Sequence, residues 1–356
     1  MVVCFIVNPV AGSGGRIGHK GSDDLSTYNP ETPLRIDRFL QKAPKVEYLV
    51  GPGVMGEKYF YNKSFSYSVV NIKIHNPTVK EDTINVVKEF MRSECEIIVF
   101  AGGDGTARDI YGLTKDSIPL LGIPTGVKMH SGIFATTPEL AGLLLDKFIK
   151  KEANMIYAEI LDVDEEAYRK GQYAVKLYGF ARTISYSNYL TPSKSEIPND
   201  PIELEDIAEY ILNEVLKPNE IYIIGPGSTT KYILKKLGYE PNFLCTDVMV
   251  GKSLIKSCVN YYDLMNLTGE LNIILTPIGK QGFLIGRGNQ EIGPEILKRI
   301  GKDRIIVIST KEKIETIDCL RIDTGDPQVD KILYGVYKVI VGYKEYIAIK
   351  SCNITD

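Results

Sequence analysis

A glycine-rich loop that joins a buried strand to a helix constrains the fold of this chain more than any other feature. The apolar run 96–101 predicts a buried strand, Gly-Gly-Asp-Gly-Thr follows it at 102–106, and residues 107–113 can form a helix. Such a junction forms an anion site, because backbone N–H groups and the helix dipole both favour negative charge there. Glycines let a phosphate approach the backbone closely. The loop therefore predicts a phosphate site at the end of a strand.

Asp104 lies in the middle of this loop, and the presence of a negative charge in a predicted phosphate site has to be explained. A carboxylate among phosphate-binding amides repels phosphate unless it holds a metal ion or takes up a proton. Asp104 can accept a proton from an attacking hydroxyl as a general base, or it can hold Mg²⁺ directly or through water. A plain Asp-Gly turn is the structural alternative. The acid favours phosphoryl transfer over nucleotide storage alone.

Two further glycine-rich loops also follow predicted strands, one from Asn8 and one from Gly225. Backbone amides and hydroxyls of the three loops can together wrap a polyphosphate. None is a Walker loop, because no Gly-Lys-Ser/Thr follows at the required spacing. The residues that we assign to phosphate or cofactor binding are Asn8, Gly12, Gly14, Gly102, Gly103, Gly105, Thr106, Lys128, Gly227, Ser228 and Thr229.

Lys128 and His130 follow another predicted strand, 119–123. Two cations at a strand end can bind phosphate. A hydrogen-bonded structural role is the alternative for His130. Arg108 can likewise reach a phosphate or remain a solvated surface side chain.

Strand and helix patterns alternate through the first 150 residues, which implies a mostly parallel sheet with helices on both faces. Ligands of such sheets bind beyond the carboxyl ends of the strands. The composition changes near residue 155, where segments such as 173–179 suggest half-exposed antiparallel strands. Thr78 and Glu81 form a capping-box pattern, and residues 203–216 predict one amphipathic helix.

Bulk properties exclude several classes of protein. The 356 residues are enough for two domains. A net charge of −3 without a long Lys/Arg block argues against a nucleic-acid-binding surface. No apolar run approaches the roughly 20 residues of a membrane span. The six cysteines are scattered without zinc-ligand spacing, so we expect buried reduced thiols in a cytoplasmic protein.

The loop 102–106 resembles the signature of the NAD kinase superfamily, which includes diacylglycerol and sphingosine kinases and is related to the phosphofructokinases. Residues 227–229 are similar to the glycine-serine-threonine motif of NAD kinases, and Thr276-Pro277-Ile278 to their threonine-proline-isoleucine segment. The whole chain resembles the archaeal and bacterial branch of predicted ATP-NAD kinases. The motifs of that branch are Asn-Pro-x-Ala-Gly, Gly-Gly-Asp-Gly-Thr-Ala-Arg-Asp, Gly-Val-Lys-Met-His-Ser, Thr-Pro-Ile-Gly-x-Gln-Gly-Phe, Gly-Arg-Gly-Asn-Gln and Asp-Thr-Gly-Asp, all present here.

The resemblance implies an α/β fold: a Rossmann-like N-terminal domain with a mostly parallel sheet over residues 1–150, and a β-rich (α+β) second domain over 151–320. The second domain would form the other wall of the cleft that holds the active site, and residues 321–356 would pack back on the first domain. In the family the residue matching Asp104 is the base that activates the 2′-hydroxyl of NAD. The residues matching Gly103, Gly105 and Thr106 contact phosphates.

The resemblance further implies ATP or polyphosphate as phosphoryl donor, with Mg²⁺ or another divalent cation, and no particular metal ligand is assigned. We expect a homo-oligomer without nucleic-acid or membrane partners. The chain lacks the Asn-Glu or Asn-Asp pair of NAD kinases at its expected place, because Asn219-Glu220 directly precedes the strand that leads to Gly225. A related small-molecule or lipid kinase of the diacylglycerol kinase type, or a catalytically silent NAD or nucleotide sensor, are the alternatives.

Overall fold

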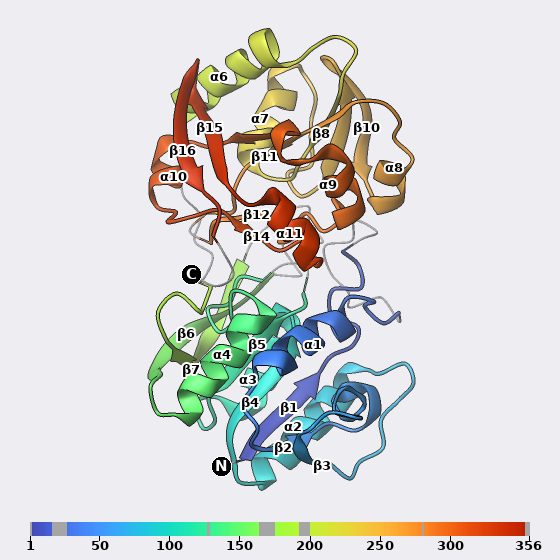
Figure 1. Ribbon diagram of the computed structural model, residues 1–356, viewed down its shortest axis with the longest axis vertical. Helices are drawn as coiled ribbons and strands as arrows, with labels where there is room; N and C mark the ends of the chain where they lie inside the picture. The colour runs from blue at the N-terminus through green and yellow to red at the C-terminus, as the bar shows by residue number, and fades with distance from the viewer. Residues whose placement is uncertain are drawn as a thin grey trace. The chain divides into compact units, whose positions relative to one another are not determined.

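A computed structural model describes residues 2–15, 27–126, 129–163, 175–191, 200–279 and 281–352 (Figure 1). The chain forms two compact units, Met1–Ser13 with Gly21–Lys194 and Gly14–Lys20 with Ser195–Asp356. Each unit has its own sheets and its own hydrophobic cores. None of the helices in the described ranges is long and apolar enough to cross a membrane.

The first unit is built on a five-stranded parallel sheet with the strand order β3-β2-β1-β4-β5. This order is that of the doubly wound dinucleotide-binding fold without its sixth strand. Its strands are β1 (Val2–Val7), β2 (Glu47–Val50), β3 (Ser66–Val69), β4 (Cys95–Gly102) and β5 (Leu120–Pro124), and its helices are α1 (Thr32–Lys42), α2 (Lys80–Arg92), α3 (Asp104–Thr114) and α4 (Pro138–Ile149), with short 3₁₀ turns at Gly53–Met55 and Glu57–Tyr59.

Apolar side chains fill both faces of this sheet, as the continuous apolar runs of its strands predict. Alternate residues of β1 point to opposite faces, so Phe5 joins the core under α1 and α4, whereas Ile6 joins the core under α2 and α3. Phe39 of α1 and Phe90 of α2 are fully buried, one in each core. The two helix layers hold the sheet rigidly, and the loops at its carboxyl edge remain to form a site.

An antiparallel hairpin of β6 (Asn154–Val163) and β7 (Val175–Ser185) completes the first unit. Ala158 pairs with Ala181, and the hairpin packs against α3 and β5. The antiparallel pairing that was predicted around residues 173–179 is therefore present. The compact unit extends past the change in composition near residue 155 and includes this hairpin.

The second unit contains a mixed seven-stranded sheet with the order β10-β9-β8-β11-β13-β15-β16. Its centre, β8-β11-β13-β15, is parallel, and its edges are antiparallel. The strands are β8 (Ile221–Ile224), β9 (Thr246–Val250), β10 (Ser253–Val259), β11 (Leu271–Leu275), β13 (Ile305–Ile308), β15 (Val336–Gly342) and β16 (Glu345–Lys350), with a separate pair of β12 (Phe283–Ile285) and β14 (Arg321–Ile322).

The helices of the second unit are α6 (Pro201–Tyr210), α7 (Ser228–Lys236), α8 (Tyr261–Met265), α9 (Pro294–Ile300), α10 (Lys311–Glu315) and α11 (Pro327–Leu333), with a π-helical turn at Ile211–Val215 and a 3₁₀ turn at Lys302–Arg304. The segment from residue 321 contributes β14, α11, β15 and β16 to this unit. The predicted α/β fold class, with a Rossmann-like first sheet and a strand-rich second unit, is confirmed.

Two helix boundaries differ from the sequence prediction. The helix predicted to begin at Thr78 begins one step later, because the carboxylate of Asp82, not that of Glu81, accepts the N–H of Val79 at 2.8 Å. The helix predicted over 203–216 is α6 followed by a π-helical turn. Asp200 caps α6 by accepting the N–H of Ile202 at 2.8 Å.

The expectation of reduced thiols is wrong, because all six cysteines are paired. The reason is the fold: partners that are 91, 13 and 33 residues apart in sequence have Cα atoms only 5.7, 4.7 and 5.2 Å apart. One pair lies across the neighbouring strands β1 and β4. The disulfides are Cys4–Cys95, Cys245–Cys258 and Cys319–Cys352.

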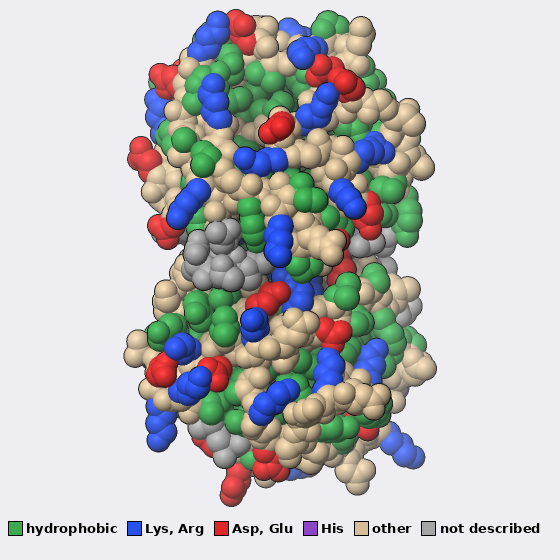
Figure 2. All heavy atoms as spheres, viewed as in Figure 1, with side chains coloured by type: hydrophobic (Ala, Val, Ile, Leu, Met, Phe, Trp, Pro, Cys, Tyr) green, Lys and Arg blue, Asp and Glu red, His purple; other side chains and the backbone are tan. Residues whose placement is uncertain are grey.

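Figure 2 shows basic and acidic side chains interspersed over the visible face of each unit. This mixture agrees with the near-neutral net charge of −3.

Candidate functional site

Three loops of the first unit leave the carboxyl edge of its parallel sheet, after β1, β4 and β5. The N–H of Asn8 donates to Ala101 O at 2.9 Å, and its side-chain Nδ2 donates to Thr106 Oγ1 at 2.9 Å. Gly102 O accepts the N–H groups of Thr125 and Gly126, both at 3.1 Å. The structure therefore brings together the predicted residues of the first and second glycine loops.

Close backbone approach explains why glycine stands at two of these positions. Gly12 has φ +81°, and a Cβ there would lie 2.0 Å from Thr125 O. A Cβ on Gly102 would lie 2.6 Å from Cβ of Thr106. A larger residue at Gly12 would push the loop after β1 away from the loop after β5, and one at Gly102 would displace Thr106 within the loop after β4.

Asp104 is the first residue of α3, where the helix dipole stabilises a carboxylate. Its side chain is only 3% exposed and is held by two consecutive residues that follow β5. Oδ2 accepts the N–H of His130 at 2.6 Å and lies 2.8 Å from the ring Nδ1 of His130. Oδ1 accepts the N–H of Ser131 at 3.0 Å and its hydroxyl at 2.7 Å. The carboxylate is thus fixed in one orientation.

The position of His130 argues against one of its two expected roles, that of a cation that binds phosphate. Its ring contacts Asp104, so the structure supports the hydrogen-bonded role over that of a phosphate-binding cation. The hydroxyl of Ser131 also lies 2.9 Å from Leu161 O and accepts the N–H of Leu161 at 3.0 Å. Strand β6 is therefore tied to the same carboxylate through Ser131.

Arg108, one turn further along α3, is held by two acids. Its Nη1 donates to Asp162 at 2.8 Å, and its Nε lies 3.3 Å from Asp109. Burial alone would lower the pKa of Arg108, but the Asp162 and Asp109 carboxylates outweigh it and raise that pKa. Lys80 also pairs with Asp109 at 2.8 Å. These contacts fix Arg108 in an ion-pair network on the helix.

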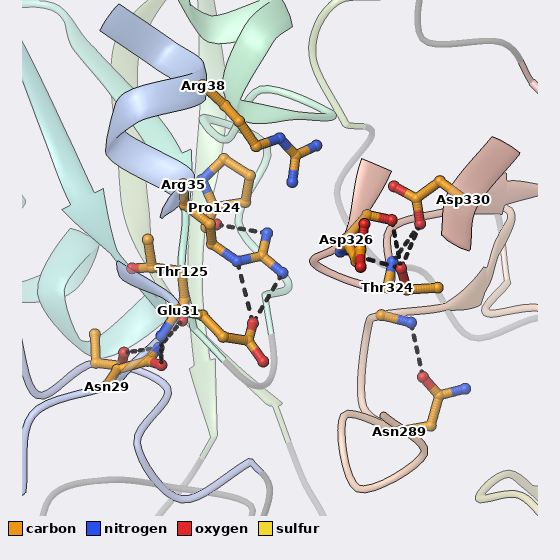
Figure 3. A network of polar contacts seen from close by, with 12 residues as sticks. Asn29, Glu31, Arg35, Arg38, Pro124, Thr125, Asn289, Thr324, Asp326 and Asp330 are labelled. Carbon is orange, nitrogen blue, oxygen red and sulfur yellow. Dashed lines mark hydrogen bonds and ion pairs between the residues drawn. The ribbon is translucent and has the colours of Figure 1, made fainter. Parts of the chain in front are cut away.

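The start of α1 braces the loops after β1 and β5, a role that sequence reasoning missed (Figure 3). Asn29 Nδ2 donates to Ala11 O at 2.9 Å and to Thr125 O at 3.3 Å. Arg35 Nη1 donates to Pro124 O at 3.2 Å. The available signal was that Arg35 stands four residues before Phe39, on the apolar face of the helix, where an arginine needs a partner.

The third glycine loop opens α7 of the second unit in a similar manner. Gly227 has φ +123°, and a Cβ there would lie 2.8 Å from Cγ2 of Thr276, which follows β11. Thr230 Oγ1 lies 2.7 Å from Gly225 O. The Oγ1 of Thr229 is buried and has no hydrogen-bond partner among the described residues. A buried donor without an acceptor costs free energy, which a ligand can recover.

Lys231 and Asp247 form a buried ion pair beneath this loop that sequence reasoning also missed. Lys231 Nζ lies 2.6 Å from Asp247 Oδ2 and 3.0 Å from Ile224 O. Asp247 Oδ1 accepts the N–H of Cys258 at 2.8 Å. The side chains are 0% and 1% exposed, so the pair is structural and fixes α7 to β8 and β9.

The acid–glycine cluster of the second unit, residues 323–326, is also internally bonded (Figure 3). Asp330 Oδ1 accepts the N–H of Thr324 at 2.8 Å and its hydroxyl at 2.7 Å. Asn289 Oδ1 accepts the N–H of Gly286 at 2.9 Å. These bonds shape the turns next to β12 and β14.

The predicted binding residues fall in both units. Asn8, Gly12, Gly102, Gly103, Gly105 and Thr106 lie around Asp104 in the first unit, whereas Gly227, Ser228 and Thr229 open α7 in the second. Gly14 begins the short stretch that belongs to the second unit. Lys128 lies outside the described residues.

A resident metal site does not fit the side chains that the structure describes. No group of three or more His, Cys, Asp and Glu residues within the described ranges could hold a metal ion. Asp104, the acid in the glycine loop, already accepts hydrogen bonds on both oxygens. Direct Mg²⁺ ligation by Asp104, one of its two predicted roles, would require one of these donors to leave.

Comparison with known families matches both halves of the chain. Residues 3–153 match the ATP-NAD kinase N-terminal domain, and residues 217–351 match the ATP-NAD kinase C-terminal domain. Searches of curated proteins and of solved structures return no match.

Proposed function

Because the chain belongs to the NAD kinase superfamily and carries both domains of this kinase type, we propose that it transfers the γ-phosphoryl group of ATP to the 2′-hydroxyl of NAD, giving NADP. The observation that carries this proposal is the fixed carboxylate of Asp104 at the N-terminus of α3, between loops whose amides suit phosphate. A phosphate-storage loop does not need a buried acid there, whereas a reaction that deprotonates a hydroxyl does.

The residues of the first unit act by binding and orientation. The first amides of α3 have no acceptor within the helix, so those of Gly105 and Thr106 can donate to phosphate oxygens. Asn8 holds the hydroxyl of Thr106 in place. Asp104 assists removal of the proton as the hydroxyl oxygen attacks in line and ADP leaves. Most of the rate enhancement in such reactions comes from positioning and electrostatics.

The predicted binding residues of the second unit take supporting roles in this proposal. Gly227, Ser228 and the Thr229 hydroxyl, which has no partner among the described residues, would bind an anionic group of a substrate. The donor would be ATP as its Mg²⁺ complex, because Mg²⁺ is commonly held by substrate phosphates together with few protein ligands. Inorganic polyphosphate is the other donor to test.

The test is turnover of the purified full chain with NAD and ATP, with NADP read by a coupled dehydrogenase. Asp104→Asn should lower kcat by about 10²–10⁴-fold, the usual contribution of a general base, while ATP binding measured by calorimetry persists. Asp109→Asn, which changes an acid on the same helix that pairs with Lys80, is the matched control and should keep near wild-type turnover.

A parallel screen of ³²P transfer to NAD, diacylglycerol and sphingosine fixes the acceptor. Label in a lipid but not in NADP would replace the proposed acceptor. Saturable NAD binding without any product, in Mg²⁺ and in Mn²⁺, would instead identify a nucleotide sensor.

A further inference from the structure

The carboxylate of Asp104 is saturated with hydrogen bonds. A carboxylate offers about four lone-pair sites. Four donors surround this one, namely the N–H and ring Nδ1 of His130 on Oδ2, and the N–H and hydroxyl of Ser131 on Oδ1. A carboxylate in this state can accept a proton from a substrate only after one donor has left.

The four donors differ in how easily they can leave. Two are backbone amides, which move only with the chain. The hydroxyl of Ser131 has a second acceptor already in place, because Leu161 O lies 2.9 Å from Oγ. A hydroxyl carries one proton, so it donates either to Asp104 or to Leu161. Rotation about its C–O bond would release Oδ1 without loss of a hydrogen bond.

We propose that His130 is a positioning residue that clamps Oδ2 of Asp104, and that Ser131 is the exchangeable donor that yields Oδ1 to the acceptor hydroxyl. This inference rests on the proposed phosphoryl transfer and names how its base is held and freed. His130 and Ser131, the consecutive residues after β5, thus take part in the chemistry of the loop that contains Asp104.

The proton and electron balance is complete without another reactant. The Ser131 hydroxyl turns to Leu161 O and keeps its proton. The acceptor hydroxyl donates to Oδ1, its O–H bond breaks, and the proton passes to Asp104. The freed oxygen forms a bond to the γ-phosphorus, and the bond from that phosphorus to ADP breaks with its electron pair leaving on ADP. His130 keeps its Nδ1 proton on Oδ2 throughout.

The same unit holds a second histidine–aspartate contact for comparison, in which the His75 side chain is 67% exposed whereas that of His130 is 3% exposed. His75 Nδ1 lies 2.8 Å from Asp82 Oδ1, and the N–H of His75 lies 3.2 Å from both Asp82 oxygens. Asp82 is likewise buried in the first turn of a helix, α2. No glycine loop precedes that helix, so this second histidine–aspartate contact serves as a helix cap alone.

The kinetic test compares His130→Ala, His130→Asn and His75→Ala in the full chain. His130→Ala should lower kcat by about 100-fold, the cost of a poorly positioned catalytic group, with KM for NAD and ATP changed little. His130→Asn keeps an N–H donor near the Nδ1 position and should restore at least about tenfold of that loss. His75→Ala should retain wild-type kcat.

Two kinetic results would overturn the proposal. One is a wild-type kcat in His130→Ala. The other is an equal loss in the Ala and Asn variants together with a raised KM, since that pattern indicates general disruption of the loop.

A spectroscopic test needs no substrate. The chain has three histidines, so ¹⁵N-histidine labelling gives three ring systems that His75→Gln and His19→Gln variants assign. The His130 ring should carry its proton on Nδ1, in slow exchange with solvent, and this signal should shift in Asp104→Asn. A His130 ring protonated only on Nε2 contradicts the clamp.

The two tests separate this inference from the proposed function. Wild-type protein without NADP formation refutes NAD as the acceptor, while the labelled spectra still decide whether the clamp exists. The same variants are then assayed with whichever acceptor the ³²P screen identifies, and an unchanged kcat in His130→Ala there refutes the positioning role.

Discussion

Replacing Lys231 with methionine should weaken the second unit more than any surface change. Nζ of Lys231 lies 2.6 Å from Asp247 Oδ2, and both side chains are at most 1% exposed. Methionine fills a similar volume but removes the ammonium group from Oδ2 of Asp247. The N–H of Cys258 still donates to Oδ1. Breaking a buried pair by removal of one partner costs about 3–5 kcal/mol, because an uncompensated charge stays buried.

That cost corresponds to a change of about 10²–10³-fold or more in an opening equilibrium. A single unfolding free energy is not defined for a chain of two compact units. Amide hydrogen exchange with mass spectrometry resolves the units instead. Peptides from α7 and β9 should lose about 10²–10³-fold protection in Lys231→Met, while peptides from β4 and α3 serve as the internal reference.

The double variant Lys231→Met with Asp247→Leu should recover much of this loss, because apolar groups of similar volume can replace a buried pair at little cost. The coupling between the two sites then measures the pair itself. Less than about tenfold loss of protection in both Lys231→Met and Asp247→Asn would refute the reasoning, since it would mean that neither buried charge needs its partner.

Three further outcomes follow from the structure. Gly12→Ala should destabilise the folded loop after β1 by about 1–3 kcal/mol and raise KM for ATP. The reason is that φ of Gly12 is +81° and a Cβ there would lie 2.0 Å from Thr125 O. Amide hydrogen exchange of peptides from this loop and steady-state kinetics check the prediction. The hydrogen bond from Lys256 lowers the pKa of Asp263 below the ordinary aspartate value of 3.8. The stabilisation of α8 by this contact is therefore fully present above that ordinary value and is lost as the pH falls through the lower folded-state value. A ¹³C carboxyl titration should give a midpoint below the ordinary value, and an unshifted midpoint contradicts the prediction. Replacing both Cys319 and Cys352 with serine should cost the second unit about 3–4 kcal/mol, from the 33-residue separation of the pair, read as lost amide-exchange protection in peptides of the second unit.

The architecture of the first unit could be predicted because the sequence patterns that indicate its strands and helices each lie within a short stretch of the chain. The strands β1, β4 and β5 are short apolar runs, each with a glycine or proline at or just beyond its end, and each helix has an apolar face. The Asp104 loop was predictable for the same reason, since strand, loop and helix are consecutive in the chain. The pairing order of the strands needed the structure.

The partners of Asp104 could not be predicted, because they come from another part of the chain. His130 and Ser131 lie 26 and 27 residues away and reach the carboxylate only since β4 and β5 are neighbours. The prediction of reduced cysteines was wrong for the same physical reason. Spacing along the chain says little about which side chains a sheet places across from one another.

The two units use one structural device with different chemistry. In each, a glycine that follows a buried strand caps a helix, Gly103 before α3 and Gly227 before α7. The first helix begins with the acid Asp104, whose charge its own N-terminus stabilises and whose oxygens are held by four donors. The second begins with neutral hydroxyl residues and keeps the Thr229 hydroxyl buried without a partner among the described residues. At the first junction the amides of Gly105 and Thr106 remain available to phosphate beside the acid. At the second junction the hydroxyl residues leave the helix N-terminus to an anion. The first junction therefore combines phosphate binding with proton transfer, whereas the second suits anion binding alone, so loss of Asp104 should lower kcat while loss of the Thr229 hydroxyl should weaken substrate binding.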